Sequence, residues 1–239
     1  MRGPSWLGHL SRPWCSGHQG AGGLALPNTL GSFEHAIQWG CQLIETDVQQ
    51  TLDGELILLH DDAISLRGQR HSIASLPATT LRIIPGYENI PPLGAFLQLC
   101  QDRVIPMLDL KSSGFEHALA TAVRSSGIKR AIVCGGPLES LLAVHHDNEE
   151  FGTSLTLDRK TLQHLAQDKS AIARIPTHLV TVDHRGLTEE LVCTFHTAGI
   201  WVIAWTVDHP STMRTLANWG IDGITTNRPD LFSWTIRRA

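Results

Sequence analysis

Short runs rich in Val, Ile and Leu alternate with segments of helical spacing along most of the 239 residues, and this alternation constrains the fold most strongly. Repeated strand and helix units favour an α/β protein, because parallel strands need a long, usually helical crossover between them. Eight units would fit a closed (β/α)8 TIM barrel, in one domain over residues 1–239. Periodicity alone leaves an open doubly wound sheet as the alternative. The predicted strands are 13–18, 42–48, 104–110, 130–134, 151–156, 178–182, 201–206 and 222–226.

Helical spacing between these strands predicts helices at about 30–38, 115–126, 137–146, 159–167, 188–198 and 211–219. One segment departs from the alternation. Asp53 and Gly54 form a tight-turn pair after the second strand, so the chain is expected to double back and carry His60 toward the barrel end. Residues 61–100 are rich in proline and are expected to form an irregular excursion, with one helix near 93–101 and no separate domain.

Composition excludes several classes of function. The formal net charge is −4, without the basic stripe that tracks a nucleic-acid backbone, so no nucleic-acid partner is expected. The five cysteines lie far apart with no C-x-x-C pair, which argues against a disulfide framework or a thiolate zinc site. No apolar run reaches membrane-spanning length, so no transmembrane segment and a cytoplasmic location are expected. The sequence does not indicate an oligomeric state.

Acidic side chains gather at the predicted carboxyl ends of two strands. Glu45 and Asp47 are two residues apart on one strand and therefore share a face, as do Asp109 and Lys111 on the next. Active sites of barrels gather at this end. Three converging carboxylates repel one another unless a cation lies among them, and an all-oxygen ligand set suits a hard divalent ion. The sequence therefore predicts a Mg²⁺ or Ca²⁺ site at Glu45, Asp47 and Asp109.

Two histidines join this end of the predicted barrel. His18 lies at the end of the first strand and His60 follows the predicted hairpin, so both could exchange protons near neutral pH. Each residue taken alone would more often be an ordinary strand-end ion pair or a hydrogen-bonded loop histidine. Their convergence at one mouth favours a catalytic site.

The segment "GAGGLA", residues 20–25, offers a competing interpretation. It matches a dinucleotide-binding glycine pattern after a strand, with acidic residues about twenty positions later. Such a loop must open directly into a helix, yet Leu26 and Pro27 follow at once. Asn28 or Thr29 is the better helix cap. The glycines are therefore expected to form a tight turn that passes close to a ligand.

Several motifs together resemble the glycerophosphodiester phosphodiesterases, a family of barrels similar to the phosphatidylinositol-specific phospholipases C. The resemblance runs almost end to end and is carried by His18, Asn28-Thr29, Phe33, Ala36, Gly40, "IETDVQQTLDGELILLHDD", "LDLK", "AWTVD" and "GIDGITTNRPDLF". It implies hydrolysis of glycerophosphodiesters to glycerol 3-phosphate and an alcohol, with a divalent metal held by the three acids. It further implies that His18 and His60 act as general acid and base, that Lys111 faces the phosphate, and that Trp205 lines the pocket.

Three positions depart from the family pattern. The family has His-Arg-Gly where this chain has His18-Gln19-Gly20, and Pro-Glu-Asn-Thr where it has Leu26-Pro27-Asn28-Thr29. Asp109 stands where bacterial members carry Glu, although sphingomyelinases D resemble this chain in having Asp. Gln19 is expected to lie at the phosphate without the planar fork of an arginine. A weakened relative that binds phosphodiesters or phospholipid headgroups is therefore the alternative to an efficient hydrolase, and a sphingomyelinase-D-like or lysophospholipase-D-like activity is a further one.

Overall fold

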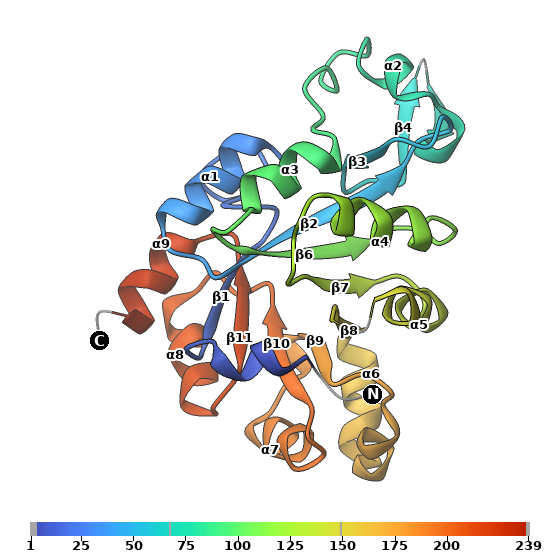
Figure 1. The fold of residues 1–239 in the computed structure, drawn as a ribbon. Helices are drawn as coiled ribbons and strands as arrows, with labels where there is room; N and C mark the ends of the chain where they lie inside the picture. The colour runs from blue at the N-terminus through green and yellow to red at the C-terminus, as the bar shows by residue number, and fades with distance from the viewer. Residues whose placement is uncertain (1–3, 67, 149, 238–239) are drawn as a thin grey trace.

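Eight parallel strands close into a barrel in the computed structural model, which describes residues 4–66, 68–148 and 150–237 (Figure 1). Each strand pairs with its neighbours in chain order, and β1 also pairs with β2 through Ser16–Leu43 and Gly17–Ile44. This last pairing closes the sheet, so the predicted TIM barrel is confirmed and the open sheet is wrong. The barrel strands are β1 (Trp14–Gly17), β2 (Leu43–Gln50), β6 (Ile105–Leu110), β7 (Ile132–Gly135), β8 (Gly152–Leu157), β9 (Leu179–Asp183), β10 (Trp201–Trp205) and β11 (Gly223–Thr226).

Helices surround the barrel and cover its outer face (Figure 1). All six helices expected between the strands are present, with ends within two residues of the expectation. No helix in the described part of the chain is long and apolar enough to cross a membrane. The α-helices are α1 (Leu30–Gln38), α2 (Ala78–Leu81), α3 (Leu93–Cys100), α4 (Glu116–Ser125), α5 (Leu138–Asp147), α6 (Arg159–Gln167), α7 (Glu189–Thr197), α8 (Pro210–Asn218) and α9 (Pro229–Phe232).

Apolar side chains close the amino end of the barrel. The first residues of several strands, among them Trp14, Leu43 and Ile105, point inward and are at most 4% exposed. A short 3₁₀ helix before β1, Ser5–His9, buries Leu7 against this layer. Trp201 stacks on Trp14 with ring centroids 5.4 Å apart. The amino end of the barrel is therefore filled by apolar side chains, and a site for polar ligands can form only at the opposite end.

The predicted reversal after β2 is present. Strand β3 (Leu56–Leu58) pairs antiparallel with β2. The end of β3 lies beside Asp47, because the N–H of Leu59 donates to the Asp47 carbonyl at 3.1 Å. The excursion that follows is more ordered than expected. It contains an antiparallel pair, β4 (Ala63–Leu66) and β5 (Gln69–Ser72), which sequence patterns did not reveal. It also has a small apolar core of its own, formed by Ile57, Ile64, Ile73 and Leu81.

Candidate active site

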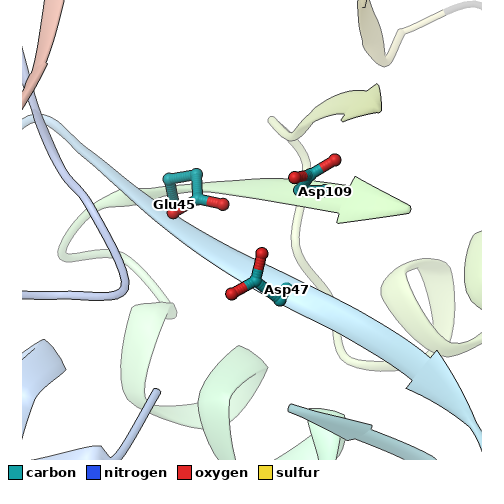
Figure 2. A group of neighbouring side chains, drawn as sticks. All are labelled: Glu45, Asp47 and Asp109. Carbon is teal, nitrogen blue, oxygen red and sulfur yellow. The ribbon is translucent and has the colours of Figure 1, made fainter. Parts of the chain in front are cut away.

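Three carboxylates meet at the carboxyl end of the barrel, as the strand periodicity predicts. Glu45 and Asp47 lie on β2, and Asp109 on β6 lies directly opposite Asp47 in the strand register. One oxygen from each side chain can be chosen so that all three lie within 4.8 Å of one another. Figure 2 shows the three side chains gathered across the two neighbouring strands. The parallel register therefore brings together acids that lie more than sixty residues apart in sequence.

Burial makes this cluster electrostatically costly. Glu45 and Asp47 are 5% and 1% exposed, and burial, with the neighbouring charges of Asp47 and Asp109, raises the pKa of Glu45 well above its ordinary value. Burial also raises the pKa of Asp109. Lys111 offsets part of this charge, because its Nζ lies 2.7 Å from Asp47 Oδ1 and 2.6 Å from Asp109 Oδ2. A cation is therefore what the cluster requires.

Two amide side chains orient Asp47. Gln19 Nε2 donates to Asp47 Oδ2 at 2.6 Å, and Asn28 Nδ2 donates to the same oxygen at 2.7 Å. The backbone N–H of Gln19 donates to Glu45 Oε2 at 3.0 Å. Gln19 thus contacts the acids themselves in this structure, and its expected contact with a phosphate stays a prediction.

The glycine-rich segment forms a tight turn and does not begin a helix. Helix α1 begins at Leu30, with Thr29 Oγ1 accepting from Ser32 N–H as the N-cap. Gly20 has φ +83°, and a Cβ there would lie 2.5 Å from Ser32. This turn brings Gln19 and Asn28 over β2, which supports the expectation that the glycines shape the backbone.

A second glycine fixes the position of Asp109. Gly135, at the end of β7, has φ +66°, and a Cβ built on it would lie 1.6 Å from Asp109 Oδ1. The carboxylate therefore occupies the space that any other side chain would need. Sequence patterns did not single out Gly135, because the requirement comes from a neighbouring strand.

His18 is held by a chain of side-chain hydrogen bonds. Its Nδ1 lies 2.8 Å from Asn227 Oδ1, and the amide of Asn227 donates to Asp208 Oδ2 at 2.8 Å. This leaves Nε2 on the side of the acids, 3.9 Å from Glu45 Oε2. Asn227 and Asp208 lie in the two C-terminal motifs noted above, but their role in orienting His18 emerges only from the fold.

His60 reaches the same end of the barrel from β3. Its Nδ1 lies 2.9 Å from Asp61 Oδ1, and both side chains are largely exposed. The hairpin thus places His60 at the rim, whereas the His18 side chain, just after β1, is more buried. The expected delivery of His60 by the hairpin is present in the structure.

One cavity of about 400 Å³ contacts nearly all of the predicted site residues. His18, Glu45, His60, Asp109, Lys111 and Trp205 line it, together with Met107, Cys134 and the threonines 156, 181, 206 and 225. Asp47 and Gln19 do not line this cavity but contact residues that do, Asp47 through Lys111 and Gln19 through Glu45. Trp205 Nε1 is buried without a hydrogen-bond partner among the described residues. The cavity therefore offers a polar, acidic floor and threonine-rich walls to a small polar molecule.

The donor set fits a hard divalent cation. All three side chains offer carboxylate oxygens, which Mg²⁺ and Ca²⁺ prefer over nitrogen or sulfur. The buried negative charge and the raised pKa of Glu45 give a physical reason for such an ion to bind. When an ion binds, Asp47 and Asp109 would either release the Lys111 ammonium or contact the ion and Lys111 at the same time.

A family model for the glycerophosphoryl diester phosphodiesterase family matches residues 18–84 and 107–231. Curated relatives include a glycerophosphodiester phosphodiesterase of Bacillus subtilis, 26% identical over 90% of this chain and 83% of its own length. A probable glycerophosphodiester phosphodiesterase 2 of Mycobacterium tuberculosis is 28% identical over 90% of this chain and 87% of its own. The chain belongs to the glycerophosphoryl diester phosphodiesterase family. The resemblance noted in the sequence is confirmed, and so is the expectation of a phosphoric diester hydrolase.

Solved structures share the fold. A putative glycerophosphoryl diester phosphodiesterase of Silicibacter pomeroyi superposes with a TM-score of 0.84 at 22% identity, covering 94% of this chain and 93% of that one. A phosphodiesterase of Oleispira antarctica, solved with its product sn-glycerol-3-phosphate, gives a TM-score of 0.77 at 21% identity, covering 94% and 97%. The barrel architecture is thus common to these proteins.

Proposed function

We propose that this protein is a metal-dependent phosphodiesterase that hydrolyses glycerophosphodiesters to glycerol 3-phosphate and an alcohol. The observation that carries the proposal is the convergence of three carboxylates and two histidines on one cavity. Family membership and the activities named for its relatives support the choice of substrate. A small glycerophosphodiester is the proposed partner, and a cytoplasmic location stays a prediction from the sequence.

Glu45, Asp47 and Asp109 would hold Mg²⁺ or Ca²⁺ at the cavity floor. When bound, the ion would polarise a phosphoryl oxygen and neutralise the charge that develops there. Lys111 would hold a second phosphoryl oxygen, since its ammonium already lies at the same carboxylates. Gln19 and Asn28 keep Asp47 in place. Trp205 would donate its unpartnered N–H to a substrate oxygen.

The partners of the two histidines suggest different proton roles. The carbonyl oxygen of Asn227 accepts from His18 Nδ1–H, which leaves the lone pair of Nε2 toward the cavity as a base. The carboxylate of Asp61 lies 2.9 Å from His60 Nδ1 and can hold that ring at the rim of the cavity, apart from the support of His18. His18 would therefore take the proton of the attacking hydroxyl, and His60 would protonate the departing oxygen.

The experiment is a pH profile of glycerol 3-phosphate release from glycerophosphocholine by the wild type, His18→Ala and His60→Ala. The wild type should give a bell-shaped profile, because one group must be neutral and the other protonated. Each variant should lose one limb of the bell and about 10² to 10⁴ in kcat. Near wild-type rates in both variants would contradict the acid and base assignment.

A second function is favoured by one observation. The described residues lining the cavity include no arginine, and Gln19 contacts Asp47 where the family carries one. A relative that binds phosphodiesters without efficient turnover would fit this feature. Saturable binding of glycerophosphocholine by the wild type, with turnover no faster than that of the His18→Ala variant, would identify that function instead.

A further inference from the structure

A second cavity of about 440 Å³ adjoins the catalytic one, and His60 lines both. One wall is the turn after β1, including Gln19, Leu26 and Pro27, and the opposite wall is formed by residues 58–61 and 86–91. Of the proposed acid and base, only His60 lines this space, which it shares with Gln19 and Asn28, the two amides that orient Asp47. The chain has thus built a second compartment directly beyond the proposed general acid.

A phosphodiester has two ester arms, and only one leaves. The general acid must lie within hydrogen-bond reach of the oxygen that departs, so the departing arm lies on the side of His60. His60 also lines this second cavity, which therefore lies within reach of the departing arm. The inference rests on the proposed function, and it assigns the two arms to different compartments: the glycerol phosphate to the catalytic cavity and the alcohol to the second.

The lining of the second cavity favours positively charged ligands. Asp61 and Glu88 contribute carboxylates and Tyr87 an aromatic ring, while the described lining residues include no lysine or arginine. Glu88 is fixed at the rim, because its Oε2 accepts from the backbone N–H of Gly86 at 2.8 Å. Carboxylates and an aromatic face together attract ammonium groups.

We propose that this compartment, the alcohol cavity, binds the departing alcohol and prefers alcohols that carry an ammonium group, such as choline and ethanolamine. In the hydrolytic step, the oxygen of water forms a bond to phosphorus and gives its proton to His18. Where a substrate hydroxyl attacks instead, the cyclic diester that forms is opened by water in a second step. The bond between phosphorus and the alcohol oxygen breaks, and His60 gives its proton to that oxygen. The neutral hydroxyl of the released amino alcohol then leaves through the alcohol cavity.

The expected discrimination is modest because the cavity is open to solvent. Asp61 and Glu88 are exposed, and one exposed cation–aromatic or ion-pair contact changes affinity by about two- to fivefold. Two such contacts should therefore favour glycerophosphocholine over glycerophosphoglycerol by about five- to twentyfold in kcat/KM. The preference should weaken as salt screens the carboxylates.

The test compares glycerophosphocholine, glycerophosphoethanolamine and glycerophosphoglycerol in the wild type, Glu88→Gln and Tyr87→Leu. Gln at position 88 can still accept from Gly86, so it removes charge with little structural change. Each variant should raise KM for the two cationic substrates by about two- to fivefold relative to KM for glycerophosphoglycerol. Glu189→Gln, an exposed acid on α7, is the matched control and should change nothing.

Equal kcat/KM for the cationic and uncharged diesters, or equal loss on all three in Glu88→Gln, would overturn the alcohol cavity. A preference for lysophosphatidylcholine that is the same in the wild type and in Glu88→Gln would also overturn it. The acyl chain of the glycerol arm would then lie against Leu26, in the cavity assigned to the alcohol. Absence of turnover on all three diesters would instead count against the proposed function. Calorimetric titration with glycerophosphocholine and glycerophosphoglycerol would then test the alcohol cavity separately from catalysis, and equal affinities for the two diesters would contradict it.

Discussion

The two ends of the barrel are built on the same strands and serve opposite purposes. On β2 the inward positions run from Leu43 to Glu45 to Asp47, and on β6 they run from Ile105 to Met107 to Asp109. The apolar residue lies at the amino end in both, and the acid at the carboxyl end. A step of two residues along the strand thus leads from a closely packed apolar layer to a charged cavity. Stability and chemistry are therefore separable by position, and substitutions at the two ends should have different consequences.

The largest effect is expected from the acids. Glu45→Gln, Asp47→Asn and Asp109→Asn should each lower metal-dependent turnover more than about 100-fold, because even residues outside the metal's own ligands cost 10- to 100-fold. The melting temperature should stay unchanged or rise, since each change removes like charge from a buried cluster. Steady-state kinetics and thermal unfolding would measure both. Glu139→Gln, an exposed acid on α5, is the control, and full activity in any of the three variants would exclude that ligand.

A substitution that leaves all three acids unchanged in sequence should reproduce part of this loss. Gly135→Ala places a Cβ where Asp109 Oδ1 lies, so it should displace that carboxylate and weaken metal binding by about tenfold or more. Gly136→Ala is a matched control, because its φ is equally positive at +64° while its Cβ would contact Leu110 and not Asp109. Metal titrations of the two variants would compare them. Equal affinities would show that Gly135 does not position Asp109.

Substitutions at the amino end of the barrel should lower stability and leave activity unchanged. Leu7 is 1% exposed and packs on the inward layer of strand starts, so Leu7→Ala should cost about 2 to 5 kcal/mol in the free energy of unfolding. The kcat and KM at a temperature where the variant is folded should equal those of the wild type. A selective loss of kcat without loss of stability would contradict the separation of the two ends.

The smallest effect concerns a buried histidine next to the amino end of β9. Burial, together with nearby His145, lowers the pKa of His178 from 6.5 to about 4, and neither ring nitrogen has a partner among the described residues. The unfolded chain therefore takes up a proton first, and stability is lost as the pH falls from 6.5 toward 4. At about 1.4 kcal/mol per pKa unit, the loss is on the order of 3 kcal/mol.

Chemical denaturation between pH 7.5 and 4 would measure that loss. His178→Leu should flatten the acid side of the stability profile, whereas His164→Leu, an exposed histidine on α6, should leave it unchanged. An acid loss of the same size in His178→Leu and the wild type would show that other groups cause it.

Sequence patterns anticipated the barrel and the acids because both depend on short-range periodicity. The two-residue repeat places Glu45 with Asp47, and strand order places Asp109 beside them. Contacts between distant segments were not accessible in this way. The support of His18 by Asn227, the hold of Asn28 on Asp47 and the space that Gly135 leaves for Asp109 depend on the closed barrel. The order within the excursion was missed because its core is only four buried residues.

The carboxyl end is proposed to act through a divalent ion, and one measurement tests that claim most directly. Glycerol 3-phosphate release from glycerophosphocholine is followed in a single preparation, first with excess EDTA and then after Mg²⁺ or Ca²⁺ is restored. No release in EDTA and full recovery with one of these ions is the predicted result. Undiminished release in EDTA would contradict the account, because Glu45, Asp47 and Asp109 would then serve the reaction without a metal.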